Sequence, residues 1–314
     1  MQNRVAVKGG RKKKFDREGF SYFLFILPVL ALIVLFKYKP LLGWYYAFTN
    51  YKVGMKPWMI QFVGLQNFGR MFLNMAYFEQ VLQVLANTLI MAFMSIFLGT
   101  PLTVAFSICL NEMNSNRARR AVQTLTTLPH FISVVTLYSV VYFMLSNNGF
   151  VNTLLMNTGR IQTPINFMAT PDHTYLKMWL YGMWKNTGWN AIVYLAAIAG
   201  IDQELYEAAM IDGAGRFRRI WHITVPGIIP TFFVLLVMSI GNLLNTGYEM
   251  QYVFQNAMNK QYIQTLDLYV YNQGISEGNI PFATAVGIMK SAVALILFSS
   301  ANALSKSIRG TSVF

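Results

Sequence analysis

The stretch PGIIPTFFVLLVMSIGNLLNTGY, residues 226–248, contains no Asp, Glu, Lys or Arg. An α-helix needs about 20 apolar residues to cross the hydrocarbon core of a bilayer. Core helices of soluble proteins are usually shorter and keep a polar face. This stretch therefore predicts a membrane-spanning helix, and an all-α polytopic membrane protein rather than a soluble helical one.

Five further apolar stretches predict five more spans. The six spans cover residues 20–36, 84–110, 131–145, 178–201, 227–248 and 282–304. Pro28 and Pro101 lie inside the first two, where membrane helices tolerate proline because neighbouring groups satisfy the freed carbonyls. The third stretch is short, and residues 125–128 could extend it. The first has a longer apolar run than a signal peptide and no A-x-A-like site after it, so we expect a retained helix.

The charged residues indicate the orientation of these spans. The chain of 314 residues is 55% hydrophobic and only 12% charged, yet its net charge is +13, from 25 Lys and Arg against 12 Asp and Glu. Fifteen of the basic residues fall on one side of the predicted membrane and eight fall in the opposite loops. The first group comprises Arg4, Lys8, Arg11, Lys12, Lys13, Lys14, Arg17, Arg117, Arg119, Arg120, Arg216, Arg218, Arg219, Lys306 and Arg309. Because cytoplasmic loops carry the excess of Lys and Arg, we expect a multi-pass protein of the plasma or inner membrane with both termini cytoplasmic.

Several classes of protein are excluded or disfavoured by this composition. Intrinsic disorder is excluded, because disordered chains are poor in apolar residues. A disulfide-stabilised secreted domain is excluded as well, because Cys109, the single cysteine, cannot form a disulfide within the chain. A basic excess can indicate nucleic-acid binding, but here the charge follows the membrane topology, so no nucleic-acid partner is expected. The basic run at residues 11–14 fits either anionic membrane lipids or a solvated tail. No phosphate-binding loop, metal-ligand spacing or nucleophile motif occurs, so catalytic residues, a bound metal and a cofactor are not expected on this chain.

The loop at residues 201–230, IDQELYEAAMIDGAGRFRRIWHITVPGIIP, predicts two short helices. Asp202 can cap the first helix, and Gly213 and Gly215 allow the chain to turn. Pro226 is expected to separate the second helix from the next span. Basic residues begin that second helix and one apolar face follows them; the residues concerned are Arg216, Arg218 and Arg219, then Phe217, Ile220 and Trp221. These features fit a hairpin lying on the membrane surface as well as a docking site for a partner.

The loop also carries a motif that favours the second interpretation. Glu207, Ala208 and Ala209 are followed by Gly213, Ile223 and Pro226 with the spacing E-A-A, three residues, G, nine residues, I-x-x-P. This pattern resembles the signature of permease subunits of binding-protein-dependent ABC importers, with Val225 where that family usually has Leu. Further stretches resemble the polysaccharide-permease branch, which is related to the maltose permeases: residues 37–40, 46–48, 62–68, 87–89, 128–130, 184–189 and 241–245.

The resemblance implies an ABC type I importer permease fold that translocates oligosaccharides or polysaccharide fragments. The family's loop docks into an ATPase subunit, and here the implied contacts are Glu207, Ala208, Ala209, Asp212, Gly213 and Arg216. ATP and Mg²⁺ would be bound by two such ATPase chains, while a second permease and an extracellular binding protein complete the implied assembly. The expected division is a basic tail (1–19), a first helix with an external loop (20–82), a five-helix core (83–304) with its coupling loop (201–226), and a short C-terminus (305–314).

Polar and aromatic residues in the fourth and fifth spans are candidates for the substrate pathway, because sugars need hydrogen bonds for hydroxyls and flat apolar surfaces for C–H faces. They are Asn186, Trp189, Asn190, Tyr194, Asn242, Asn245, Tyr248 and Glu249, with Lys290 in the sixth span. The same Asn and aromatic residues could instead join helices or sit at the membrane interface. Lys185 and Lys290 suggest an anionic sugar, although Lys290 could also extend to the interface. An importer for glycerol phosphate or peptides, and a six-span membrane enzyme or sensor, are the alternative interpretations.

Overall fold

The computed structural model describes residues 17–309, and every regular element in that range is helical apart from one isolated bridge between Thr49 and Phe62. Most of the predicted basic tail lies outside the described residues. The principal helices are α1 (Arg17–Ile33), α3 (Met75–Met94), α4 (Thr100–Asn111), α5 (Asn116–Thr127), α6 (Val134–Leu145), α8 (Thr174–Ala199), α11 (Val225–Gly241) and α15 (Ile280–Arg309). The shorter ones are α2 (Gln66–Leu73), α7 (Phe150–Asn157), α9 (Gln203–Ile211), α10 (Arg216–Arg219), α12 (Glu249–Phe254), α13 (Lys260–Ile263) and α14 (Leu266–Tyr271).

Five helical stretches of the described chain are long and apolar enough to cross a membrane. They are Gly19–Phe48, Met75–Asn111, Val134–Asn157, Arg216–Gly241 and Ile280–Ala303. The remaining predicted span corresponds to α8, whose 26 residues are long enough to cross a bilayer but less apolar. Because α8 packs against α4, α5 and α11, it is the interior helix of the bundle and can carry polar residues that lipid would not accept.

Irregular turns interrupt several of the predicted spans. In the second span a π-helical turn, Ser95–Gly99, joins α3 to α4 in one continuous helical path, and Pro101 lies directly after this turn. The region before the third predicted span was expected to be a loop, but it is helical. Residues 116–127, which include the supposed loop residues Arg117, Arg119 and Arg120, form α5 along α8, and a 3₁₀ turn (Leu128–Phe131) leads into α6.

The fifth span differs from its prediction at both ends. Pro226 does not separate α10 from the span, because a π-helical turn (Ile220–Thr224) continues the helical path and leaves proline in the first turn of α11. At the other end α11 stops at Gly241, seven residues before the predicted end. The side-chain amide of Asn242 donates to the carbonyl of Met238 at 3.0 Å, directly after the last helical residue. The segment that follows is not helical, and Gly247 within it adopts φ +73°.

Buried amide side chains join segments that are distant in sequence. The Asn67 Nδ2 atom donates to the carbonyls of Ala47 and Thr49, both at 2.9 Å. Asn87, fully buried in α3, donates to the carbonyls of Gln261 and Gln264 at 2.8 and 2.9 Å. Such bonds satisfy irregular backbone that hydrocarbon cannot hydrate.

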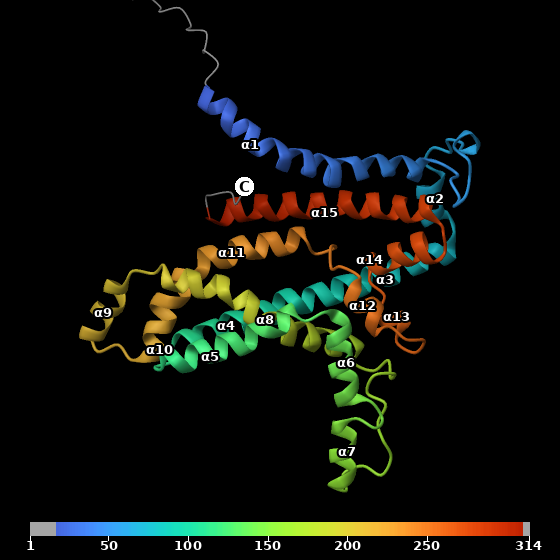
Figure 1. Cartoon of the computed structure of the whole chain (residues 1–314). Helices are drawn as coiled ribbons and strands as arrows, with labels where there is room; N and C mark the ends of the chain where they lie inside the picture. The colour runs from blue at the N-terminus through green and yellow to red at the C-terminus, as the bar shows by residue number, and fades with distance from the viewer. Residues whose placement is uncertain (1–16, 310–314) are drawn as a thin grey trace, which may run out of the picture.

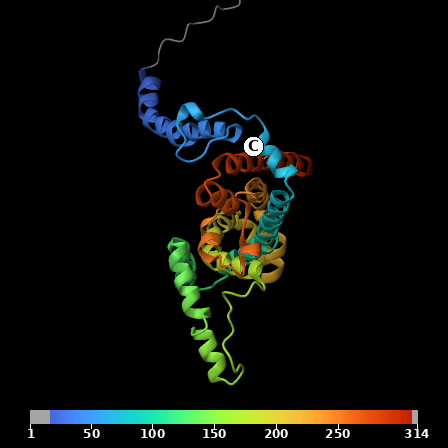
Figure 2. The same ribbon diagram turned by 90° about the vertical axis from the view of Figure 1, so that its right-hand side faces the viewer.

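The bundle has two distinct ends. The start of α1, the end of α15 and the α9–α10 hairpin lie at one end, while α2 lies at the other (Figure 1). Helices α6 and α7 project away from the bundle axis, as the rotated view also shows (Figure 2). The apolar part of α1 has no buried residue, so its side chains are available to lipid or to another membrane chain.

Candidate functional site

The α9–α10 hairpin is built as its sequence predicts. The Asp202 carboxylate accepts a hydrogen bond from the backbone N–H of Glu204 at 3.0 Å, which caps α9. Gly213 ends the helix with φ +73°, a conformation that other residues adopt only with strain. Backbone bonds from Asp212, Gly213 and Ala214 to the last turn of α9 then close the hairpin. The hairpin therefore has a defined shape without any partner.

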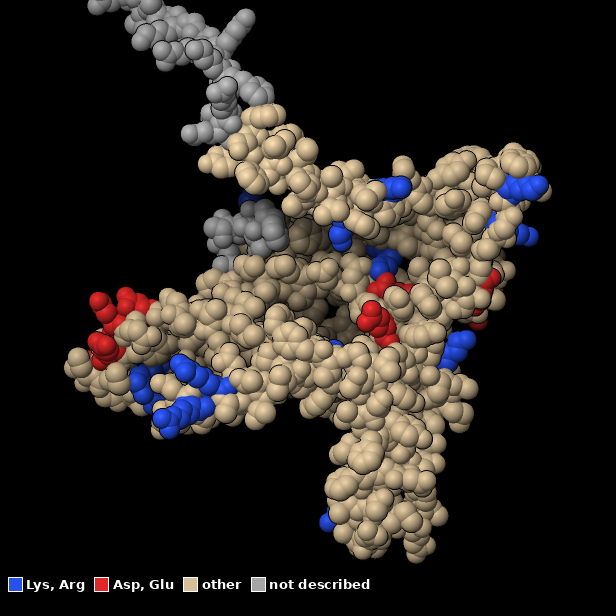
Figure 3. All heavy atoms as spheres, viewed as in Figure 1, with Lys and Arg blue, Asp and Glu red and all other residues tan. Residues whose placement is uncertain are grey.

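The hairpin exposes apolar and charged side chains together. Ile211 and Phe217 are each 87% exposed and Trp221 is 70% exposed. Acidic residues of α9 and basic residues around α10 form neighbouring patches at this end of the molecule (Figure 3). Exposed large apolar residues with a charged surround are typical of a protein interface.

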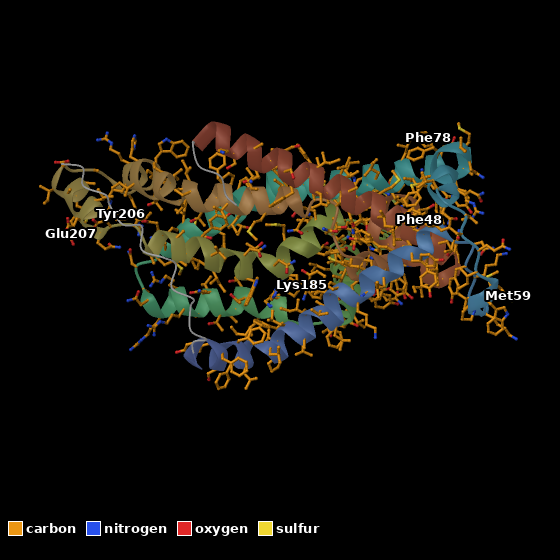
Figure 4. The ribbon with its side chains drawn as sticks, turned by 90° about the horizontal axis from the view of Figure 1, so that it is seen from above. Phe48, Met59, Phe78, Lys185, Tyr206 and Glu207 are labelled. Atoms are coloured by element: carbon orange, nitrogen blue, oxygen red, sulfur yellow. The ribbon has the colours of Figure 1, made fainter. Side chains whose placement is uncertain are left out.

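The predicted docking residues do not all face solvent in the same way. Glu207, Ala208, Asp212 and Gly213 are exposed, and Ala209 is half-buried. Glu207 lies at the outer edge of the hairpin beside Tyr206 (Figure 4). Arg216 is exposed but bonded within the chain, where its Nε donates to Glu112 Oε2 at 2.7 Å. Ile211 was not singled out from the sequence, although an apolar residue directly before the predicted Asp212–Gly213 turn could have indicated an exposed contact.

A cavity of about 500 Å³ lies within the bundle where two spans are irregular. Its walls come from the π-helical turn between α3 and α4, from α8, from α11 and from the segment that follows Gly241. Five predicted pathway residues line it: Asn186, Asn190, Tyr194, Asn242 and Asn245. The structure thus brings these residues from two spans to one space. Irregular backbone at membrane depth is typical of such polar cavities.

Among the described residues the cavity lining is uncharged and combines polar groups with apolar side chains. Besides the five residues above, hydroxyl, amide and indole groups come from Ser95, Thr100, Thr103, Trp179, Ser239, Thr246 and Gln251. The buried Trp179 Nε1 and Gln251 Oε1 atoms have no hydrogen-bond partner within the described structure. A buried unpaired donor and acceptor cost free energy unless water or a ligand satisfies them.

Four predicted pathway residues do not line the cavity. Trp189 stacks on His130, with ring centroids 4.6 Å apart and planes 3° apart, and Tyr248 stacks on Tyr271 at 4.5 Å. Glu249 is exposed at the start of α12. The fourth residue, Lys290, pairs with Asp267, and both side chains are largely buried.

The two intramembrane lysines therefore already have partners. Lys185, midway along the bundle (Figure 4), donates to the carbonyls of Pro129 and His130 at 3.3 and 2.8 Å and also to that of Ile132. Asp267 accepts from Lys290 and from the backbone N–H of Gly247 at 2.9 Å, which holds the segment after α11 in place. In this structure neither ammonium group is free to meet an anionic ligand in the cavity.

Known proteins resemble this chain over most of its length. The family model "binding-protein-dependent transport system inner membrane component" matches residues 85–310. The protein LplB of Bacillus subtilis (strain 168) is 38% identical over 90% of this chain and 88% of its own length. The polygalacturonan/rhamnogalacturonan transport system permease protein YteP of the same organism is 37% identical over 90% of this chain and 87% of its own length.

A solved structure shares the whole fold. A chain of a bacterial ABC transporter involved in the import of the acidic polysaccharide alginate superposes with a TM-score of 0.83 and 33% sequence identity. The match covers 93% of this chain and 97% of that chain. The agreement in fold and sequence, together with the matched family model, shows that this chain belongs to the inner-membrane permease components of binding-protein-dependent ABC importers.

Proposed function

We propose that this permease moves oligosaccharides or polysaccharide fragments, delivered by an extracellular binding protein, through the cavity between α3, α4, α8 and α11. The observation that carries the proposal is the uncharged lining, in which amide and hydroxyl groups from several helices face one space together with apolar side chains. Sugar hydroxyls both donate and accept hydrogen bonds, so they can pair with these amide and hydroxyl groups. The similarity to YteP and to the alginate importer chain supports the same class of substrate.

The proposed substrate contacts do not depend on charge. An acidic glycan that passes through the cavity of this chain meets amides, hydroxyls and aromatic faces, since the described lining has no Lys or Arg. Lys185 and Lys290 stabilise the helix packing and do not bind the sugar. Lys185 donates to backbone carbonyls, and Lys290 forms an ion pair with Asp267. Any compensation of a uronate charge comes from other chains of the importer.

A separate ATPase chain binds the α9–α10 hairpin in this proposal and holds ATP and Mg²⁺. Exposed Ile211 and Phe217 are the apolar anchors, and Glu207, Ala208, Asp212 and Gly213 are the surrounding contacts. The assembly contains two ATPases and a second permease, which is a different chain. Both termini are cytoplasmic in this proposal, which is supported by the start of α1 and the end of α15 lying at the same end of the bundle as the hairpin (Figure 1). Closure of the ATPases switches the cavity from inward-open to outward-open by rigid-body movement.

Uptake in cells tests this proposal. A strain lacking this chain is compared with the same strain carrying it, using labelled oligomers of galacturonate, alginate, arabinose and maltose. We expect uptake of at least one of these oligomers to require the chain, ATP and the extracellular binding protein. Unchanged uptake of every sugar, combined with chain-dependent uptake of glycerol phosphate or peptides, would contradict it.

A further inference from the structure

Arg216 fastens the α9–α10 hairpin to another cytoplasmic turn. Its guanidinium donates to Glu112 Oε2 at 2.7 Å, to the Glu112 carbonyl, and to Asn114 Oδ1 at 2.9 Å. Glu112 and Asn114 lie in the short turn between α4 and α5, more than a hundred positions earlier in the chain. A guanidinium has five N–H donors in a rigid plane, so three acceptors from one turn fix its orientation.

A second contact fastens the hairpin to the following span. The Tyr206 hydroxyl of α9 and the Thr224 Oγ1 atom are 2.9 Å apart, and Thr224 is buried at the start of α11. Close packing supports this junction, because a Cβ atom on Gly227 would lie 2.4 Å from Ile201 Cδ1. Tyr206 lies on α9 next to the exposed Glu207 (Figure 4).

The two fastened spans are also walls of the cavity. Helix α4 contributes Thr100 and Thr103 to the lining, and α11 contributes Leu235 and Ser239. A displacement of the hairpin therefore reaches both walls through short bonded connections. Packed elements transmit such displacements because they shift between discrete arrangements rather than deform continuously.

We propose that Arg216 and Tyr206 are positioning residues that transmit movement of the hairpin to α4 and α11. This inference rests on the proposed function, in which an ATPase binds the hairpin. Arg216 binds Glu112 and Asn114 through its Nε and Nη2 atoms, which ties the hairpin to the turn between α4 and α5. The hairpin's own ATPase anchors are the exposed apolar residues on its outer surface.

The test uses the complete importer, produced from its operon and reconstituted in proteoliposomes with its binding protein. Three variants, Arg216→Gln, Glu112→Gln and Tyr206→Phe, are compared with Arg117→Gln, a matched control on exposed α5. The readouts are the amount of ATPase that co-purifies and the ratio of ATPase activity with loaded binding protein to activity without it. We expect co-purification within about twofold of wild type, and a stimulation ratio reduced about tenfold in Arg216→Gln and Glu112→Gln.

The double variant Arg216→Gln/Glu112→Gln separates a shared role from two independent ones. Because both residues form one connection, we expect the double variant to be no worse than either single variant. Loss of ATPase from Arg216→Gln with normal behaviour of Glu112→Gln would overturn the inference, as would full stimulation in all three variants. Absence of any ATPase from the wild-type complex would overturn the proposed function, and this inference with it.

Discussion

The α9–α10 hairpin and the membrane cavity differ in which polar and apolar groups they present and where. The hairpin lies outside the bundle and exposes large apolar side chains beside charged ones, whereas the cavity lies within the bundle and its lining combines uncharged amides and hydroxyls with apolar side chains. Covering exposed apolar groups with a protein lowers the free energy of the system. Pairing the polar groups of the cavity with a hydroxylated ligand or water lowers it as well. The difference indicates a protein partner for one region and a sugar for the other.

The two regions are connected by α8, the interior helix. Its middle contributes Asn186, Asn190 and Tyr194 to the cavity, and its end at Ala199 leads directly into the hairpin. Gly188 allows the end of α5 to approach this helix closely. Changes in the buried scaffold of the bundle should therefore have larger effects than changes in either region alone.

The largest effect is expected from the buried ion pair beside the cavity. Lys290→Met leaves Asp267 buried and unpaired, which costs about 3–5 kcal/mol of stability. Thermal unfolding of the purified protein in detergent measures this loss. The double variant Lys290→Met/Asp267→Leu should recover most of it, because the buried charge is removed. Normal stability of Lys290→Met with selective loss of acidic-sugar uptake would instead assign Lys290 to the substrate.

Gly188→Ala is expected to have the next largest effect. The added Cβ atom would lie 2.2 Å from the Thr126 carbonyl oxygen, so α5 or α8 must move. Overpacking of this kind costs about 1–3 kcal/mol. Gly182→Ala is the matched control on the same helix, since nothing lies within 4 Å of its Cβ position. Equal unfolding temperatures for the two variants would contradict this account of the packing.

Variants of the hairpin surface should separate docking from folding. Ile211→Ser and Phe217→Ser remove the exposed anchors, so we expect loss of the co-purifying ATPase and of uptake. Thermal stability should change by less than about 0.5 kcal/mol, because these side chains are exposed. Leu73→Ser, at an 88% exposed residue outside the hairpin, is the control. Retention of the ATPase by both hairpin variants would break the distinction between the two regions.

Single cavity variants should have the smallest effects. Asn190→Ala and Ser239→Ala each remove one hydrogen-bonding group from the lining, which should raise the KM for sugar uptake about twofold to tenfold. Ser139→Ala on α6 removes a hydroxyl outside the lining and should leave KM unchanged. A fall in maximal rate with unchanged KM would show that the lining residues act on helix movement instead.

The two regions also differ in how far the sequence could predict them. The hairpin depends on local signals, Asp202 as a cap and Gly213 at positive φ, and both act as predicted. The all-α fold could be predicted from the long apolar stretches, because a segment in hydrocarbon must satisfy its own backbone hydrogen bonds and an α-helix does so.

Non-local contacts limited the prediction of the cavity. Spacing along α8 could bring Asn186, Asn190 and Tyr194 to one face, but it could not reveal that Trp189 stacks on His130. Nor could it reveal Asp267 as the partner of Lys290 or Glu112 as the partner of Arg216. These pairs join residues that only the folded bundle brings together. The early end of α11 depends likewise on the turn at residues 242–247 and its bond to Asp267.

Site-specific cross-linking tests the central claim, that an ATPase binds the α9–α10 hairpin, most directly. Cysteine is introduced at Ile211, at Phe217 or at the exposed Trp58 of the opposite end, in a Cys109→Ala background that has no other cysteine. A bifunctional reagent is then applied to the assembled importer. We predict that cysteine at Ile211 and at Phe217 cross-links to the ATPase and that cysteine at Trp58 does not. An ATPase cross-link from Trp58, or none from either hairpin position, would contradict the account.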